Sequence, residues 1–121
     1  MITSPTRQEQ AQAILQRRAA RTASQILGRR ASTAADFAEA FTLERVDMIA
    51  EIDGVVTMLA LGRNRSGPQD GLYIIEEADG FRIYVQEQGL PQNERSGMSF
   101  DEARDAVIDR IVMLNGIPYQ F

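Results

Sequence analysis

Residues 71–89, GLYIIEEADGFRIYVQEQG, decide the fold, because two runs rich in β-branched and aromatic residues lie on either side of a turn. Ala78-Asp79-Gly80 is typical of a three-residue hairpin loop, since Gly80 can adopt the positive φ that follows a type I turn. This loop places Glu77 opposite Phe81. The stretch therefore predicts an antiparallel β-hairpin with that register.

The predicted register divides the hairpin side chains between two faces of the sheet. The apolar face holds Tyr73, Ile75, Phe81, Ile83 and Val85. The mixed face holds Ile74, Glu76, Arg82, Tyr84 and Gln86. Because an apolar face must be buried against another element, we expect a helix to cover it.

Residues 99–114 predict that covering helix. Ser99 can cap the helix N-terminus while Glu102 completes a capping box. Apolar side chains then recur at helical spacing, at Phe100, Ala103, Val107, Ile111 and Leu114. Asn115-Gly116 and Pro118 end the helix. We expect Val107 and Ile111, in the middle of this stripe, to lie in the core.

The N-terminal segment predicts two further helices. Ser4-Pro5 is typical of an N-cap and first helical position, and an Ala-rich stripe predicts one helix over residues 1–28 with a glycine at its end. Thr33 and Asp36 form a second capping pattern, which predicts a short helix over residues 33–42.

The charge is distributed unevenly along the chain. Residues 1–31 contain six Arg and one acidic residue, Glu9, for a net charge of +5. Residues 32–121 contain seven Arg and sixteen acidic residues, for a net charge of −9. We expect the basic N-terminal helix to dock on the acidic body. A mitochondrial presequence and contact with anionic lipid or nucleic acid are the alternatives.

From Arg45 onward the hydrophobic period changes. Apolar residues alternate with polar ones, and Asp53-Gly54 is a strong hairpin signal. We therefore expect strands at residues 44–52 and 55–62. A continuous helix over residues 34–52 is the alternative, because the apolar residues there also fit helical spacing.

Polar segments that contain Gly and Pro predict loops at residues 63–71 and 87–98. The order of elements predicts an α+β fold in one domain, residues 1–121, whose sheet and helix core spans residues 44–114. This fold has two N-terminal helices, a four-stranded antiparallel meander and a C-terminal helix packed on the sheet. The apolar tail Ile117–Phe121 either packs on the core or contributes to a contact surface.

The amino-acid composition excludes several kinds of catalytic and metal-binding site. The chain has 121 residues, of which 44% are hydrophobic, and this is enough for a folded core. It contains no Cys, His or Lys, so thiol catalysis, thiolate or imidazole metal ligands and Schiff bases are excluded. No apolar run approaches the ~20 residues of a membrane span. We expect a cytoplasmic bacterial protein that binds no membrane and no cofactor; the exclusive use of Arg indicates the codon bias of a GC-rich genome.

Two groups of carboxylates have a spacing that could support metal binding or catalysis. Asp101, Asp105 and Asp109 form one stripe of the last helix, which suits a divalent cation but equally a solvated helix face. No second element supplies matching ligands, so we expect no metal site. Glutamates in the second hairpin suit glycoside hydrolysis, but there is no Trp to stack sugars, and we expect no enzyme activity. The acidic last helix also argues against nucleic acid as a partner.

The second hairpin and last helix carry a resemblance. Gly80-Phe81-x-Ile83-Tyr84-Val85, Glu87-Gln88-Gly89, Phe100 and Glu102-Ala103 together resemble small bacterial immunity proteins, which neutralise secreted polymorphic toxins. The likeness covers about residues 71–114, and Gln88 stands where those proteins often have Arg. It implies a non-catalytic cytoplasmic inhibitor that binds a cognate toxin. An adaptor, a secretion chaperone and a phage-encoded acidic inhibitor are the alternatives.

An acidic body suits association with a basic protein, because opposite charges steer the encounter. Binding also needs a buried anchor, for which Tyr84 on the mixed face and Leu90 in the loop are the candidates. The predicted partner-binding residues are Glu76, Glu77, Asp79, Tyr84, Glu87, Leu90 and Glu94. The sequence does not specify an oligomeric state.

Overall fold

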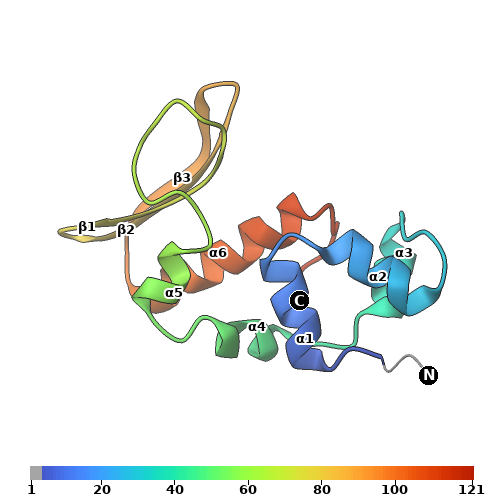
Figure 1. The fold of residues 1–121 in the computed structure, drawn as a ribbon. Helices are drawn as coiled ribbons and strands as arrows, with labels where there is room; N and C mark the ends of the chain where they lie inside the picture. The colour runs from blue at the N-terminus through green and yellow to red at the C-terminus, as the bar shows by residue number, and fades with distance from the viewer. Residues whose placement is uncertain (1–3) are drawn as a thin grey trace. The chain divides into compact units, whose positions relative to one another are not determined.

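A computed structural model describes residues 4–121 of the chain; residues 1–3, which the predicted N-terminal helix included, lie outside the described residues. The fold is α+β, as predicted (Figure 1). In order, the elements are α1 (Arg7–Leu15), α2 (Ala19–Leu27), α3 (Ala34–Ala40), α4 (Arg45–Glu51), α5 (Val55–Leu59), β1 (Gly71–Glu77), β2 (Gly80–Glu87), β3 (Leu90–Met98) and α6 (Phe100–Leu114).

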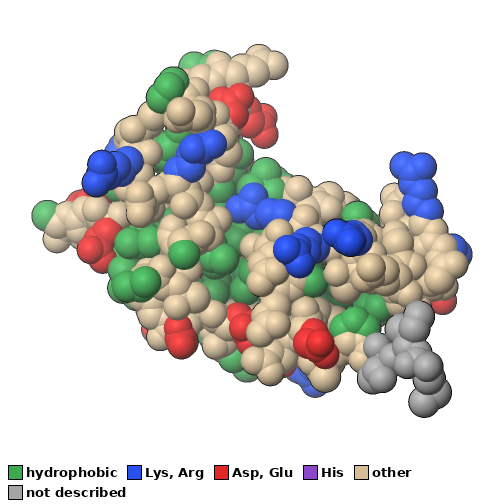
Figure 2. All heavy atoms as spheres, viewed as in Figure 1, with side chains coloured by type: hydrophobic (Ala, Val, Ile, Leu, Met, Phe, Trp, Pro, Cys, Tyr) green, Lys and Arg blue, Asp and Glu red, His purple; other side chains and the backbone are tan. Residues whose placement is uncertain are grey.

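The chain divides into two compact units. Unit 1 comprises Met1–Glu51 and Ile111–Phe121, and unit 2 comprises Ile52–Arg110, so α6 has residues in both. Unit 1 contains seven Arg and six acidic residues, a net charge of +1, whereas unit 2 contains six Arg and eleven acidic residues, a net charge of −5. In unit 1, basic side chains gather over the region of α1 and α2 (Figure 2). The acidic surplus therefore belongs to unit 2.

The single N-terminal helix predicted from the sequence is wrong, because α1 and α2 are separate helices. Thr6, not Ser4, is the N-cap of α1. Arg17 has a φ of 64°, which interrupts the helix. The side chain of Asn115 donates to the carbonyl of Ile14 at 2.9 Å and accepts from the N–H of Ala19 at 3.2 Å. One amide thus supplies partners on both sides of the interruption, where a continuous helix would have used its own backbone.

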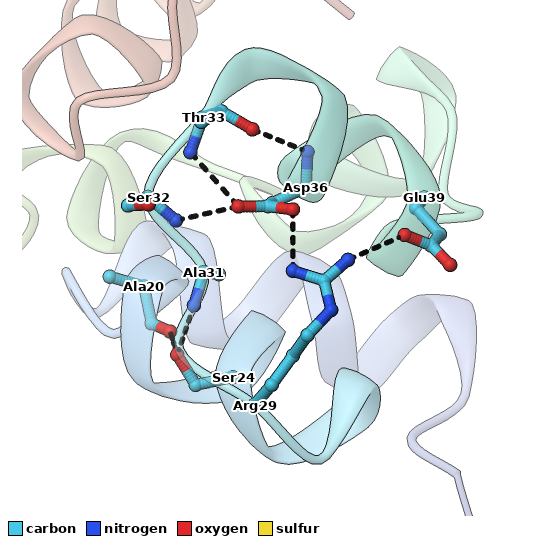
Figure 3. A network of polar contacts seen from close by, with 8 residues as sticks. All are labelled: Ala20, Ser24, Arg29, Ala31, Ser32, Thr33, Asp36 and Glu39. Atoms are coloured by element: carbon cyan, nitrogen blue, oxygen red, sulfur yellow. Dashed lines mark hydrogen bonds and ion pairs between the residues drawn. The ribbon is translucent and has the colours of Figure 1, made fainter.

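α2 and α3 pack together, and a polar network joins the end of α2 to α3 (Figure 3). The guanidinium of Arg29 lies 2.6 Å from the Asp36 carboxylate and 2.9 Å from that of Glu39. Asp36 also accepts from the backbone N–H groups of Ser32 and Thr33, and the predicted capping box of α3 is confirmed. Backbone hydrogen bonds and Arg29 stabilise the charged carboxylate, so the pKa of Asp36 lies well below its usual range.

α1 and α4 also pack together in unit 1. Gln10 is 3% exposed, and its side-chain oxygen accepts from the backbone N–H groups of Thr42 and Leu43 at 2.9 and 3.1 Å. Arg7 forms an ion pair with Asp47 at 2.8 Å. The expected docking of the N-terminal segment is therefore seen within unit 1, where Ala11, Ile14, Leu15, Ala19 and Ala23 are buried.

The hairpin predicted at residues 44–52 and 55–62 is wrong, because these segments form α4 and α5. Met48 and Ile52 are fully buried, while Val46 is 57% exposed, so burial follows a four-residue rather than a two-residue period. Gly54 is the N-cap of α5, and the Asp53 carboxylate accepts from the Thr57 hydroxyl at 2.9 Å. Asp53-Gly54 thus begins a helix here. The alternative of one helix over residues 34–52 is also wrong, since α3 ends at Ala40.

The sheet lies in unit 2 and, within the described residues, has three antiparallel strands in the order β1-β2-β3 rather than four. The β1–β2 hairpin is confirmed, but its predicted register is off by one residue. Its loop is the dipeptide Ala78-Asp79, so Glu77 pairs with Gly80 and Tyr73 pairs with Tyr84. A one-residue shift moves a strand's side chains to the opposite face. Tyr73 therefore shares a face with Tyr84, and Ile74 shares a face with Ile83.

The loop predicted at residues 87–98 is wrong, because most of it forms β3. Residues 90–97 are all exposed, so the segment lacks the alternation that marks a half-buried strand. Pro91 is tolerated because β3 is an edge strand. β3 also approaches Gly80 so closely that a Cβ atom there would lie 2.6 Å from the carbonyl oxygen of Met98. Pairing with β2, rather than its own sequence pattern, makes this segment a strand.

The predicted final helix is confirmed. Ser99 and Glu102 form the expected capping box, with both hydrogen bonds at 3.2 Å. Val107 and Ile111 are fully buried, as predicted. Within unit 2, the ring of Phe100 packs edge-on against Phe81 with centroids 6.4 Å apart. This contact joins the start of α6 to the face of β2 that also carries Ile83.

Candidate functional site

The other face of the β1–β2 hairpin holds a buried aromatic pair. Tyr73 and Tyr84 stack with ring centroids 4.8 Å apart and an angle of 9° between the rings. The Arg82 guanidinium lies 5.7 Å from the centroid of the Tyr84 ring, and its Nε lies 3.4 Å from the Glu77 carboxylate. Tyr73 is fully buried and Tyr84 is 5% exposed. Tyr84, predicted as a surface anchor, is therefore part of the interior.

Side chains on this same face also hold the backbone of the loop that precedes β1. The Tyr73 hydroxyl lies within hydrogen-bond distance of the carbonyl oxygens of Gly67 and Gln69, which share its single proton. The side-chain amide of Gln86 donates to these same two oxygens, at 3.1 and 3.0 Å. Gln86 is 8% exposed, so two buried side chains hold the backbone of residues 67–69. A loop fixed in this way presents its outer side chains with little loss of entropy on binding.

We call the turn between β2 and β3 the hairpin tip; it comprises Glu87, Gln88, Gly89 and Leu90. Gln88 and Gly89 have φ angles of 52° and 78°, which is the conformation of a tight two-residue hairpin turn. The Asp70 carboxylate accepts from both of their N–H groups, at 2.9 and 3.1 Å. Glu87 is exposed, and the side chain of Leu90 is 64% exposed. The tip is thus a braced turn with one large apolar side chain in solvent.

The sheet separates the predicted acidic residues into groups. Glu76, Glu77 and Asp79 lie at the β1–β2 turn, where Glu77 pairs with Arg82. Glu87 and Leu90 lie at the opposite end of β2, which is eight residues or roughly 25 Å long. Glu94 lies in β3 and is exposed. The structure therefore brings Glu87 and Leu90 together but does not gather the seven predicted residues at one place.

Sequence reasoning missed Asp70. This residue lies in a polar loop and has no local pattern that links it to the hairpin tip. An acidic residue before a strand is common, and only the fold brings this one to the N–H groups of Gln88 and Gly89. The sequence likewise places Gln86 on the mixed face but does not indicate its hydrogen bonds to residues 67 and 69.

Over residues 4–121, no helix is both long enough and apolar enough to cross a membrane, and no group of three or more acidic side chains is placed to hold a metal ion. Comparison of the chain with protein-family models, with curated proteins and with solved structures found no match.

Proposed function

We propose that this chain is a non-catalytic, protein-binding inhibitor of the bacterial immunity type, which neutralises a cognate toxin in the cytoplasm. The contact is made by unit 2, with the hairpin tip and Glu94 as its centre. The observation that carries the proposal is the exposed Leu90 on a turn that Asp70 braces.

The tip combines two properties of a binding centre. A large apolar side chain that is exposed in the free protein gains free energy when a partner buries it. The turn that carries Leu90 has its backbone N–H groups already bound by Asp70, so little further ordering is needed on binding. Of the two predicted anchors, Tyr84 is buried and Leu90 is exposed, so Leu90 is the proposed anchor.

The charge of unit 2 supports a basic partner. Its net charge of −5 attracts cationic surfaces over roughly a Debye length of 8–10 Å. Glu87 lies within the tip, and Glu94 is exposed on the adjoining strand. These charges act mainly on the association rate, whereas Leu90 acts on the lifetime of the complex.

The test begins with a partner isolated by the tagged full chain from its native host and then purified. The partner's own activity is titrated with the chain. Loss of activity at one chain per partner supports the inhibitor. A tight complex that leaves the partner fully active overturns inhibition and assigns an adaptor or chaperone. Turnover of a small molecule by the chain alone overturns the non-catalytic assignment.

Two sets of variants test the surface. Leu90→Asp should weaken the complex about tenfold or more, because it removes the apolar anchor. Val56→Asp is the matched control, since Val56 on α5 is 84% exposed. Reversing Glu87 and Glu94 to Arg should slow association and reduce its salt dependence. If Leu90→Asp binds the partner as tightly as the wild type does, the contact does not involve the hairpin tip.

A further inference from the structure

The end of α5 and the connection to β1 surround an open hollow of about 560 Å³ in unit 2. The connection is the wide green loop after α5 in Figure 1. Its lining contains two ionisable residues, Arg63 and Arg65, together with the polar side chains of Asn64 and Ser66. Among the residues that the structure describes, no acidic side chain lines it. The hollow is therefore a local site of charge +2 within a unit of net charge −5.

Within residues 4–121, no acidic side chain forms an ion pair with either of these two arginines. By contrast, Arg7, Arg29, Arg82 and Arg104 all form ion pairs. The Nε of Arg63 makes one long contact of 3.4 Å with the carbonyl oxygen of Asp70. Arg63 and Arg65 are both exposed. Unit 2 has more acidic residues than arginines, yet none of them pairs with Arg63 or Arg65 among the described residues. Both guanidinium groups are therefore available to an anionic ligand.

The backbone around the hollow is held in place from both ends. The N–H of Arg63 donates to the carbonyl of Leu72, and the N–H of Ile74 donates to the carbonyl of Arg63, each at 2.8 Å. Gly62 comes so close to β1 that a Cβ atom there would lie 2.8 Å from the carbonyl oxygen of Leu72. At the other end, Tyr73 and Gln86 bind the carbonyls of Gly67 and Gln69. The backbone on both sides of residues 64–66 is therefore held in place by hydrogen bonds.

We propose that this hollow binds a phosphate-bearing small molecule, with Arg63 and Arg65 as the charged contacts and Asn64 and Ser66 as neutral donors. A phosphate monoester carries about two negative charges at neutral pH, which matches two guanidinium groups, whereas a carboxylate carries one. Guanidinium groups donate paired hydrogen bonds to phosphate oxygens. The site is distinct from the hairpin tip, and its function does not depend on the proposed protein partner.

The full chain, labelled with ¹⁵N, is titrated separately with inorganic phosphate, AMP and acetate, and amide shifts are followed by NMR. Saturable shifts centred on residues 63–67 with phosphate or AMP support the site. Tighter binding of AMP assigns a phosphate monoester, and tighter binding of inorganic phosphate assigns the free ion. Acetate binding as tightly as phosphate, or shifts that do not saturate with either phosphate ligand, would overturn the proposal.

Arg65→Gln should weaken binding about tenfold, the effect of one lost charge-assisted hydrogen bond. The Arg65 side chain contacts no other described side chain through a hydrogen bond or ion pair, so the melting temperature should stay unchanged. Arg95→Gln is the matched control, because it removes an exposed positive charge from β3 of the same unit. If Arg95→Gln weakens binding as much as Arg65→Gln does, the anion responds only to total charge and there is no site. Arg63→Gln provides a second variant with the same expected loss.

Discussion

The carboxylate of Asp70 accepts a hydrogen bond of 2.9 Å from the backbone N–H of Gln88, although the two residues are 18 positions apart in the sequence. The neighbouring N–H of Gly89 donates to the same carboxylate at 3.1 Å. Turn residues with positive φ direct successive N–H groups to one side, where an anion binds them. Asp70 thereby joins the loop before β1 to the far end of β2.

Asp70→Ala removes both hydrogen bonds and should lower the free energy of unfolding by about 1 kcal/mol, since the bonds lie at the surface. The larger effect should be local. Hydrogen exchange at Gln88 and Gly89 should become faster, measured by NMR on the folded protein. Asp79→Ala removes the same charge at the other turn and should change neither quantity. Unchanged exchange in Asp70→Ala would show that the tip is stable without this carboxylate.

Asn115→Asp should lower the free energy of unfolding by about 2–3 kcal/mol. The side-chain NH₂ that donates to the carbonyls of Ile14 and Ile111 is replaced by an oxygen, which leaves both carbonyls facing a negative charge. Urea unfolding of the two proteins measures the difference. Gln25→Glu, the same chemical change on the exposed side of α2, should have little effect. Similar losses in both variants would mean that Asn115 does not stabilise the α1–α2 junction.

Val107→Asp places a carboxylate at a fully buried position of α6. The expected loss is about 4 kcal/mol or more, which should leave little folded protein. Circular dichroism melting curves measure it. Val56→Asp makes the same substitution at an exposed position and should melt like the wild type. A cooperative melt of Val107→Asp near the wild-type temperature would contradict the burial of this helix face.

The depressed pKa of Asp36 makes part of the stability pH-dependent. Its pKa is lower in the folded state than in the unfolded state, where it is roughly 3.9. Its contribution is therefore present above that value and declines as the pH falls toward the folded pKa. The wild type should be more stable than Asp36→Asn near neutral pH, and the difference should shrink below about pH 4.

Denaturant unfolding at a series of pH values measures this convergence. Asp79→Asn is the control, because Asp79 is exposed and has no hydrogen-bond or ion-pair partner among the described residues. Its difference from the wild type should stay near zero throughout. A stability difference for Asp36→Asn that is constant with pH would assign the effect to packing rather than to charge.

The sequence alone determined the elements whose signals are local. The capping boxes at Thr33 and Ser99 are each completed by a residue three positions later, so the starts of α3 and α6 were predicted correctly. The β1–β2 hairpin followed from hydrophobic period, as did the burial of Ala103, Val107 and Ile111 in α6, whereas Leu114 at the end of the predicted stripe is exposed. For the candidate site, Glu87 and Leu90 were predicted to lie in an exposed loop; both are exposed, although the segment forms a turn and β3.

The tertiary structure decided features that depend on distant partners. Asn115 satisfies the backbone at the α1–α2 junction, and no pattern in residues 1–28 indicates that break. The alternation over residues 46–52 fits either a strand or a helix, and burial of Met48 and Ile52 selects the helix. β3 forms because its backbone pairs with β2. The exposed, polar sequence of this segment does not by itself indicate a strand.

In the candidate functional site, too, some features depend on the tertiary structure rather than on the local sequence. The register of β1 and β2 differs from the prediction by one residue, and this single step pairs Tyr73 with Tyr84 and buries both. A turn sequence is compatible with loops of two or three residues, so the choice between them is made by the packing of whole strands. The contact between Asp70 and the hairpin tip also depends on strand packing. It joins residues 18 positions apart, so no local sequence pattern predicts it.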